Sequence, residues 1–122
     1  MDDLKLCYFI NGEGTTPMDC RPLAQKAKSL LNGCHAECLV VSGPGPGSQP
    51  DVSQIVEVKQ VAGDTPVFCG TGCNETNCDA ILAAADGAFV GSAFKKDGVF
   101  TGRIDEERVA RFMQKAKALR KD

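Results

Sequence analysis

Two glycine-rich segments are the part of this sequence best suited to binding a small anion. Glycine has no side chain, so a phosphate group can approach the backbone closely and meet amide groups that point at it. Each segment directly follows a short apolar run, which is where ligand-binding loops leave a parallel sheet. Tight turns without a ligand explain the same glycines, and that alternative stays open. The predicted phosphate-binding residues are Gly70, Thr71, Gly72, Gly91, Ser92 and Ala93.

Polar residues after the other apolar runs extend this candidate site. Asn11 and Ser42 end two such runs, and the segment GPGPGSQP at 43–50 has too much glycine and proline for a helix or strand. We interpret this segment as a flexible lid, because it lacks the Lys-Ser/Thr ending of a P-loop. Lys95 and Lys96 either add positive charge to the phosphate site or form an ordinary solvated pair. The further candidates are Asn11, Ser42, Gly43, Lys95, Lys96 and Asp97.

Groups for acid–base catalysis are scarce. The only histidine, His35, lies in a segment that enters an apolar run, so we expect it at the opposite end of the sheet from the candidate site. Cys73 follows the first glycine segment, where a helix N-terminus could lower its pKa, but no histidine is placed to act as its base. The sequence therefore predicts ligand binding and leaves open whether the protein is an enzyme.

Seven cysteines are many for a chain of 122 residues. Their number is odd, and their closest spacings, C-x₃-C and C-x₄-C, differ from the paired C-x₂-C of structural zinc sites. We expect reduced thiols that pack as small apolar side chains. Neither a metal site nor a cofactor is predicted.

Charge and hydropathy exclude several classes of partner. The formal net charge is -2, from 14 Lys+Arg and 16 Asp+Glu, which gives no basic surface for nucleic acid. No apolar run approaches the roughly 18–20 residues that span a bilayer. The first residues, 1–4, are acidic, unlike the basic start of a secretion signal. We therefore expect a cytoplasmic protein with no membrane span and no nucleic-acid partner.

Short apolar runs alternate four times with segments of helical periodicity. The run at 38–41 is continuously apolar, as in a strand buried on both faces, and Asp51 and Asp105 are placed to cap helices. This alternation predicts an α/β fold with a parallel sheet, and we treat residues 1–122 as a single domain. The expected strands cover 4–10, 38–41, 66–69 and 88–90, and the expected helices cover 23–33, 51–63, 74–85 and 105–116, the third with Asn74 as its N-cap.

Four such units fit two architectures. One is half of a (β/α)₈ TIM-type barrel with parallel strands, since a complete barrel needs about 250 residues. The other is an open flavodoxin-like sheet.

Four segments resemble the BtpA/SgcQ family. They are AECLVVSG at 36–43 with the Gly/Pro loop that follows it, DTPVFCGTGC at 64–73, AADGAFVGSAFKKDG at 84–98 and IDEERV at 104–109. The resemblance implies a (β/α)₈ barrel of about twice this length, of which this chain would be the C-terminal half. Its last two strands would then be strands seven and eight, after which the phosphate sites of such barrels commonly lie.

The chain departs from the pattern of this family in two ways. Ile10–Asn11 stands where the family tends to have a Lys-His pair, and the motifs of the family's N-terminal half are absent. If catalysis needs the Lys-His pair or the motifs of the N-terminal half, this chain alone is inactive.

Two classes of function fit these observations. The first is a half-barrel that binds a phosphate-bearing small molecule and belongs to, or descends from, a metabolic enzyme; the resemblance includes members labelled as phosphoribosyl isomerases or nucleosidases. The second is a non-catalytic assembly or interaction module, because one family member is associated with photosystem I accumulation. An inactive fragment of a longer barrel enzyme is a further alternative.

A half-barrel also predicts self-association. It leaves two unpaired parallel edges and an inner face without a partner, which favours a homodimer or higher homo-oligomer. The side chains expected on this inner face are Leu6, Tyr8, Val40, Phe68 and Phe89.

Overall fold

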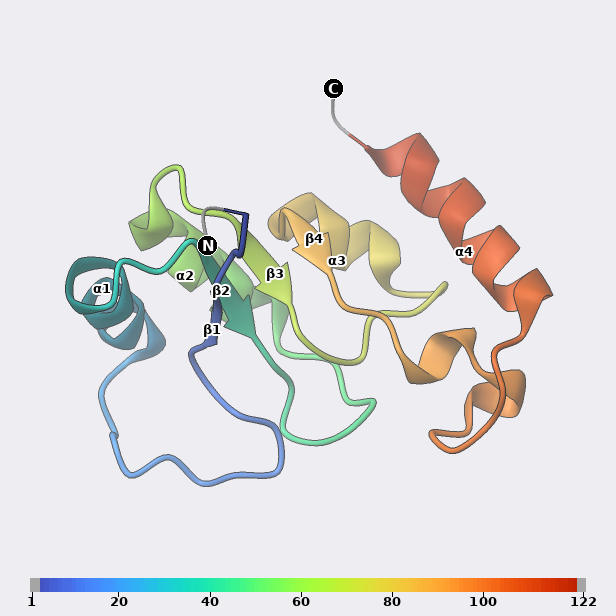
Figure 1. The fold of residues 1–122 in the computed structure, drawn as a ribbon, viewed down its shortest axis with the longest axis horizontal. Helices are drawn as coiled ribbons and strands as arrows, with labels where there is room; N and C mark the ends of the chain where they lie inside the picture. Colours follow the sequence, from blue (N-terminus) through green and yellow to red (C-terminus); the bar gives the residue numbers. More distant parts are fainter. Residues whose placement is uncertain (1–2, 121–122) are drawn as a thin grey trace.

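The computed structural model describes residues 3–120, which contain one sheet of four parallel strands (Figure 1). The strands follow the order of the sequence, β1-β2-β3-β4, and each is followed by a helix. This confirms the predicted half-barrel order of four βα units. In the flavodoxin-like order β1 would lie between β2 and β3, which is not the order observed. The strands are β1 (Cys7–Phe9), β2 (Cys38–Val41), β3 (Val67–Cys69) and β4 (Gly87–Ala88).

The strands are shorter than the apolar runs that predicted them, because pairing sets their ends. β1 pairs with β2 only from Cys7 to Phe9, and the amide of Leu6 donates to the Glu37 carboxylate instead of to a neighbouring strand. β4 pairs with β3 over two residues, one position earlier than expected. A further ladder bond, from the Phe89 amide to the Cys69 carbonyl at 2.9 Å, still ties the segment after β4 to β3.

The four helices are α1 (Leu23–Gly33), α2 (Val52–Ala62), α3 (Cys78–Ala84) and α4 (Glu106–Leu119). Two of the predicted caps are confirmed. The Asp51 carboxylate accepts from the Ser53 amide, and the Asp105 carboxylate accepts from the amides of Glu107 and Arg108. These bonds satisfy amides that have no partner within the helix.

The predicted N-cap of α3 is wrong. α3 begins at Cys78, with Asn77 in the N-cap position. The Asn74 side chain instead accepts from the amides of Thr76 and Asn77, which closes a turn before the helix. The Asn77 side chain accepts from the Asn74 amide and donates to the Gly72 carbonyl, so this turn is tied to the end of β3.

The two faces of the sheet differ sharply. One is covered by the helices, and alternate strand residues such as Leu39, Val41 and Val67 lie fully buried in the helix-side core. On the other face, Phe9, Val40 and Phe68 are paired across three strands, and the Phe68 ring makes an edge contact with Phe89, with centroids 5.7 Å apart. No helix covers this second, open face in Figure 1.

The open face contains most of the side chains expected there, with two corrections. Val40, Phe68 and Phe89 lie on it, as predicted, but Val40 is fully buried there. Tyr8 packs against the helix-side core, and Leu6 precedes β1. Phe9 takes the inward position because Tyr8 faces the helix-side core and side chains alternate along β1.

A compact connection carries the chain from β4 to α4 (the orange segment in Figure 1). It contains two 3₁₀ turns, η1 (Ser92–Phe94) and η2 (Lys96–Gly98). The Asp105 amide donates to the Phe94 carbonyl at 2.7 Å, and the Phe94 ring packs edge-on against Phe112 with centroids 5.2 Å apart. These contacts hold the beginning of α4 beside the loop that leaves β4.

Candidate functional site

A cavity of about 840 Å³ lies at the carboxyl ends of β3 and β4. All six residues predicted to bind phosphate line it: Gly70, Thr71, Gly72, Gly91, Ser92 and Ala93. Residues from the loops after β1 and β2 and from the beginning of α4 complete its wall, among them Glu13, Gly47, Arg108 and Arg111. The other sequence candidates, Asn11, Ser42, Gly43, Lys95, Lys96 and Asp97, lie outside this lining.

Three consecutive backbone amides at the cavity have no acceptor. Among the described residues, the amides of Gly91, Ser92 and Ala93 donate no hydrogen bond to any other group of the chain. Gly91 has φ of -120°, and a Cβ built on it meets no atom within 4 Å. The absence of a side chain at Gly91 therefore leaves open space beside free donors.

The glycines after β3 have a different explanation. The Gly70 amide donates to the Val41 carbonyl at 2.8 Å, and a Cβ at Gly70 would lie 2.5 Å from the Ser42 hydroxyl oxygen. Gly72 has φ of +77°, and a Cβ there would lie 2.2 Å from the Gln49 amide nitrogen. Close packing within the chain accounts for both glycines.

Thr71 joins two strand-end loops. Its hydroxyl accepts from the Gly43 amide at 2.8 Å and donates to the Ser48 carbonyl at 2.9 Å. The Asn77 side chain also donates to the Gln49 side chain. The Gly/Pro segment at 43–50, which we interpreted as a flexible lid, is therefore anchored to the end of β3 at several points.

Asn11 joins the loops after β1 and β2. Its side-chain amide donates to the Ser42 carbonyl at 2.7 Å, and its side-chain oxygen accepts from the Ser42 amide at 2.9 Å. The Ser42 side-chain hydroxyl is buried and has no hydrogen-bond partner among the described residues. Both polar groups of the Asn11 side chain therefore bind the Ser42 backbone and join the loops after β1 and β2.

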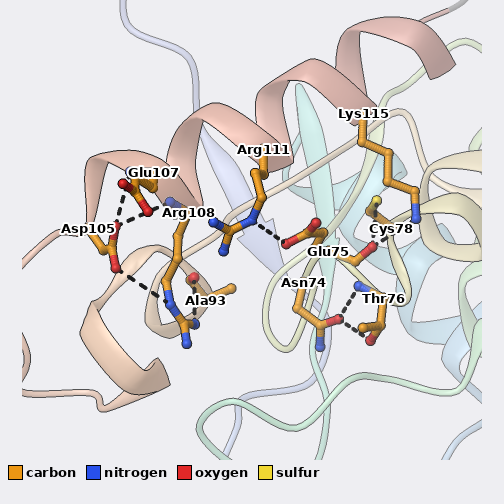
Figure 2. Close-up of polar contacts among 10 residues, drawn as sticks. All are labelled: Asn74, Glu75, Thr76, Cys78, Ala93, Asp105, Glu107, Arg108, Arg111 and Lys115. Carbon is orange, nitrogen blue, oxygen red and sulfur yellow. Dashed lines mark hydrogen bonds and ion pairs between the residues drawn. The ribbon is translucent and has the colours of Figure 1, made fainter.

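The positive charge at the cavity comes from α4. Arg108 Nη1 lies 3.4 Å from the Ala93 carbonyl oxygen, and Arg111 Nε lies 3.3 Å from Glu75 Oε2 (Figure 2). The i, i+3, i+7 spacing of Arg108, Arg111 and Lys115 places all three on one helix face. The sequence does not identify these arginines as site residues, because helical spacing does not tell which loop that face meets.

The lysines identified from the sequence are placed elsewhere. The Lys95 ammonium lies 4.7 Å from the centroid of the Phe100 ring and donates to the Phe100 carbonyl. Lys96 and Asp97 lie in η2 and are exposed. These charges belong to the connection between β4 and α4.

Thiol chemistry at the cavity is disfavoured. Cys73 is 3 % exposed, and burial, with smaller contributions from Cys69 and Cys78, raises the pKa of its thiol to about 12. Burial also raises the pKa of Cys69, whose thiol donates to the Thr71 carbonyl. The idea that a helix N-terminus lowers the pKa of Cys73 is therefore wrong, because desolvation dominates.

The remaining cysteines and His35 take no part in the cavity lining. Cys38, Cys69, Cys73 and Cys78 are buried as small side chains, whereas Cys7, Cys20 and Cys34 are exposed, against expectation. His35 is exposed in the loop that enters β2, at the predicted end of the sheet. Within residues 3–120 no three His, Cys, Asp or Glu side chains are close enough to hold a metal ion. Nor does that part of the chain contain a helix long and apolar enough to cross a membrane.

Comparison with known proteins gives consistent matches in sequence and fold. The model of the BtpA family matches residues 3–118. The putative sgc region protein SgcQ of Escherichia coli is 34% identical over 119 residues, which cover 98% of this chain and 44% of that protein. The photosystem I biogenesis protein BtpA of Synechocystis is 34% identical over 79 residues, which cover 65% of this chain and 28% of that protein.

A solved structure with the same arrangement is N-(5'-phosphoribosyl)anthranilate isomerase from Pyrococcus furiosus, a TIM barrel. The TM-score is 0.57 at 20% identity, and the match covers 92% of this chain and 49% of the isomerase. At this identity the likeness shows the fold alone. This chain spans about half of the isomerase, and less than half of the curated relatives it matches.

Proposed function

This chain belongs to the BtpA family, and on that premise we propose that it binds a phosphorylated small molecule in the cavity at the ends of β3 and β4. The observation that supports this most is the run of three free amides at Gly91–Ala93, which line the cavity. Phosphate oxygens are acceptors, so they would pair donors that the chain itself leaves unpaired. The position also agrees with the phosphate sites of complete barrels, which commonly follow the last two strands.

The size of the cavity suits a small ligand, and one of its guanidinium groups lies beside Ala93. About 840 Å³ lies within the range of ordinary small-molecule sites. Its wall contains the guanidinium groups of Arg108 and Arg111 and the carboxylates of Glu13 and Glu75, and Arg111 and Glu75 already neutralise each other. No residue arrangement here assigns a reaction, so the proposal is one of binding.

Phosphate titration followed by amide NMR tests this function. Inorganic phosphate should shift the amide signals of residues 70–73 and 91–94, with weak, salt-sensitive affinity, while chloride at equal ionic strength should not. In Gly91→Val the added side chain enters the open space beside the amides, so the shifts should vanish while the rest of the spectrum is kept. Shifts that cluster elsewhere, or no shifts at all, contradict the proposal.

We also propose that a second copy of the chain covers the open face of the sheet. Phe9 is 53% exposed and Phe89 is 45% exposed on this face, and β1 and β4 each have an unpaired parallel edge. Burial of apolar surface is worth about 25 cal/mol per Å², so covering this face favours association. The complete barrel of the isomerase is twice as long as the matched region, so two copies would supply the same number of strands.

Sedimentation at micromolar concentration tests the association. The wild-type chain should sediment as a dimer or larger species, and Phe89→Asp should shift it toward monomer by placing a charge on the open face. Met18→Asp is the matched control, because Met18 is fully exposed in the loop after β1. A folded, strictly monomeric wild type contradicts this proposal. Association without phosphate binding would instead favour the assembly-module alternative.

A further inference from the structure

Arg108 is the cationic side chain of the cavity that contacts the η1 turn. The Arg108 Nη1 atom lies 3.4 Å from the Ala93 carbonyl oxygen, and its Nε lies 3.9 Å from the Asp105 carboxylate. The first distance is long for a hydrogen bond, and the second is long for an ion pair. No other acceptor among the described residues contacts its guanidinium. A guanidinium carries five N–H donors, and most of those in Arg108 are therefore free.

The position of Arg108 is fixed by its neighbours on α4. Lys115 Nζ lies 2.6 Å from the Asp79 carboxylate and donates to the Glu75 carbonyl at 2.9 Å. Figure 2 shows the bond of Lys115 to Glu75, which fastens α4 to the β3–α3 loop. The ring contact between Phe94 and Phe112 fastens α4 to η1. The Arg108 guanidinium is thus held beside the carbonyl oxygen of Ala93, the residue that carries the last of the three free amides.

We propose that Arg108 binds the phosphate group of the ligand together with the amides of Ser92 and Ala93, and that the ligand is a phosphate monoester. This inference rests on the proposed function. A planar guanidinium can donate two parallel hydrogen bonds to a phosphate, and its charge complements a dianion that three neutral amides alone would hold weakly. Lys95, the nearest sequence candidate, has its ammonium over the Phe100 ring instead.

Arg111 supplies an internal control. It lines the same cavity with the same charge, but its Nε pairs with Glu75 of the β3–α3 loop at 3.3 Å, and not with the η1 turn. A general electrostatic effect of positive charge near the cavity would weaken binding equally when either arginine is neutralised. A direct contact would make the effect specific to Arg108.

Calorimetric titration with inorganic phosphate and with glycerol 3-phosphate tests the inference. Arg108→Gln should weaken the binding of both at least about tenfold, whereas Arg111→Gln should change it less than about threefold. Arg108→Lys keeps the charge but not the paired donors, so its affinity should lie between wild type and Arg108→Gln. Amide spectra and thermal unfolding of each variant establish that it is folded.

The outcomes separate this inference from the function on which it rests. If wild type binds phosphate at Gly91–Ala93 and Arg108→Gln binds equally well, the role of Arg108 is overturned and the proposed function stands. Equal losses in Arg108→Gln and Arg111→Gln overturn the direct contact. If Arg108→Gln does not fold, a wild-type affinity in Arg108→Lys overturns it. If wild type binds no phosphate, both proposals are wrong.

Discussion

The two parts of the strand-end rim use similar residues for different purposes. Around Asn11, Ser42 and Thr71, backbone and side-chain groups bind one another and join the loops after β1, β2 and β3. Around Gly91–Ala93, amides and the Arg108 guanidinium keep donors that the chain does not use. The first part is a structural clamp, and the second has the unused donors that a binding site needs.

The glycines make this contrast most visible. At Gly70 and Gly72 a side chain would collide with other loops of the chain, whereas at Gly91 it would enter open space. A glycine-rich sequence is therefore ambiguous, because close packing and ligand access both require the loss of a side chain. Substitutions can separate the two causes.

The largest expected effect is at Gly72. Gly72→Ala combines a left-handed backbone conformation with overlap against the Gln49 backbone, and should lower the free energy of unfolding by about 3 kcal/mol. The matched control Gly91→Ala should change it by less than about 0.5 kcal/mol. Urea denaturation of both variants measures the difference. Equal costs would remove the distinction between the packing glycine and the glycine beside the free amides.

A smaller effect is expected at Thr71. Thr71→Val keeps the shape of the side chain but leaves the buried Gly43 amide without its acceptor, which should cost about 1–3 kcal/mol of unfolding free energy. Thr71→Ser keeps the hydroxyl and should restore most of the stability. Phosphate affinity should change little in either variant. A stable Thr71→Val that has lost phosphate binding would instead assign Thr71 to the ligand.

The smallest effect is expected at Ser42. Its buried hydroxyl has no partner among the described residues, so Ser42→Ala removes a desolvated polar group and should leave stability unchanged or raise it by up to about 1 kcal/mol. The exposed Ser48 gives a control for the same substitution. A loss of more than about 1 kcal/mol in Ser42→Ala alone, by thermal or urea unfolding, would mean that this hydroxyl is bonded in solution.

Periodicity was sufficient to predict four βα units, whereas their order in the sheet followed from the family resemblance. Some features depend only on residues that are neighbours in sequence, such as the apolar run at 38–41 and the N-caps Asp51 and Asp105. The four strands and the four helices form where these features lie. The strand ends and the beginning of α3 were less accurate, because they depend on pairing partners and on the Asn74–Asn77 turn. Local sequence does not specify such contacts.

The candidate site was predicted in part for the same reason. The sequence predicts the glycine segments that line the cavity because each follows a strand. Parallel strands bring their carboxyl ends to one edge of the sheet, where ligands bind. Arg108 was missed because its place beside Ala93 depends on how the β4–α4 connection folds back. Lys95 was favoured by its nearness in sequence, but its ammonium packs on Phe100.

A crystal structure of the chain grown with millimolar phosphate is the most direct test of the central claim. The account predicts one phosphate ion within hydrogen-bond distance of the Ser92 and Ala93 amides and of the Arg108 guanidinium. It predicts no phosphate on the Asn11–Ser42 part of the rim. Phosphate bound there, or on Lys95 and Lys96, with none at Gly91–Ala93, would contradict it.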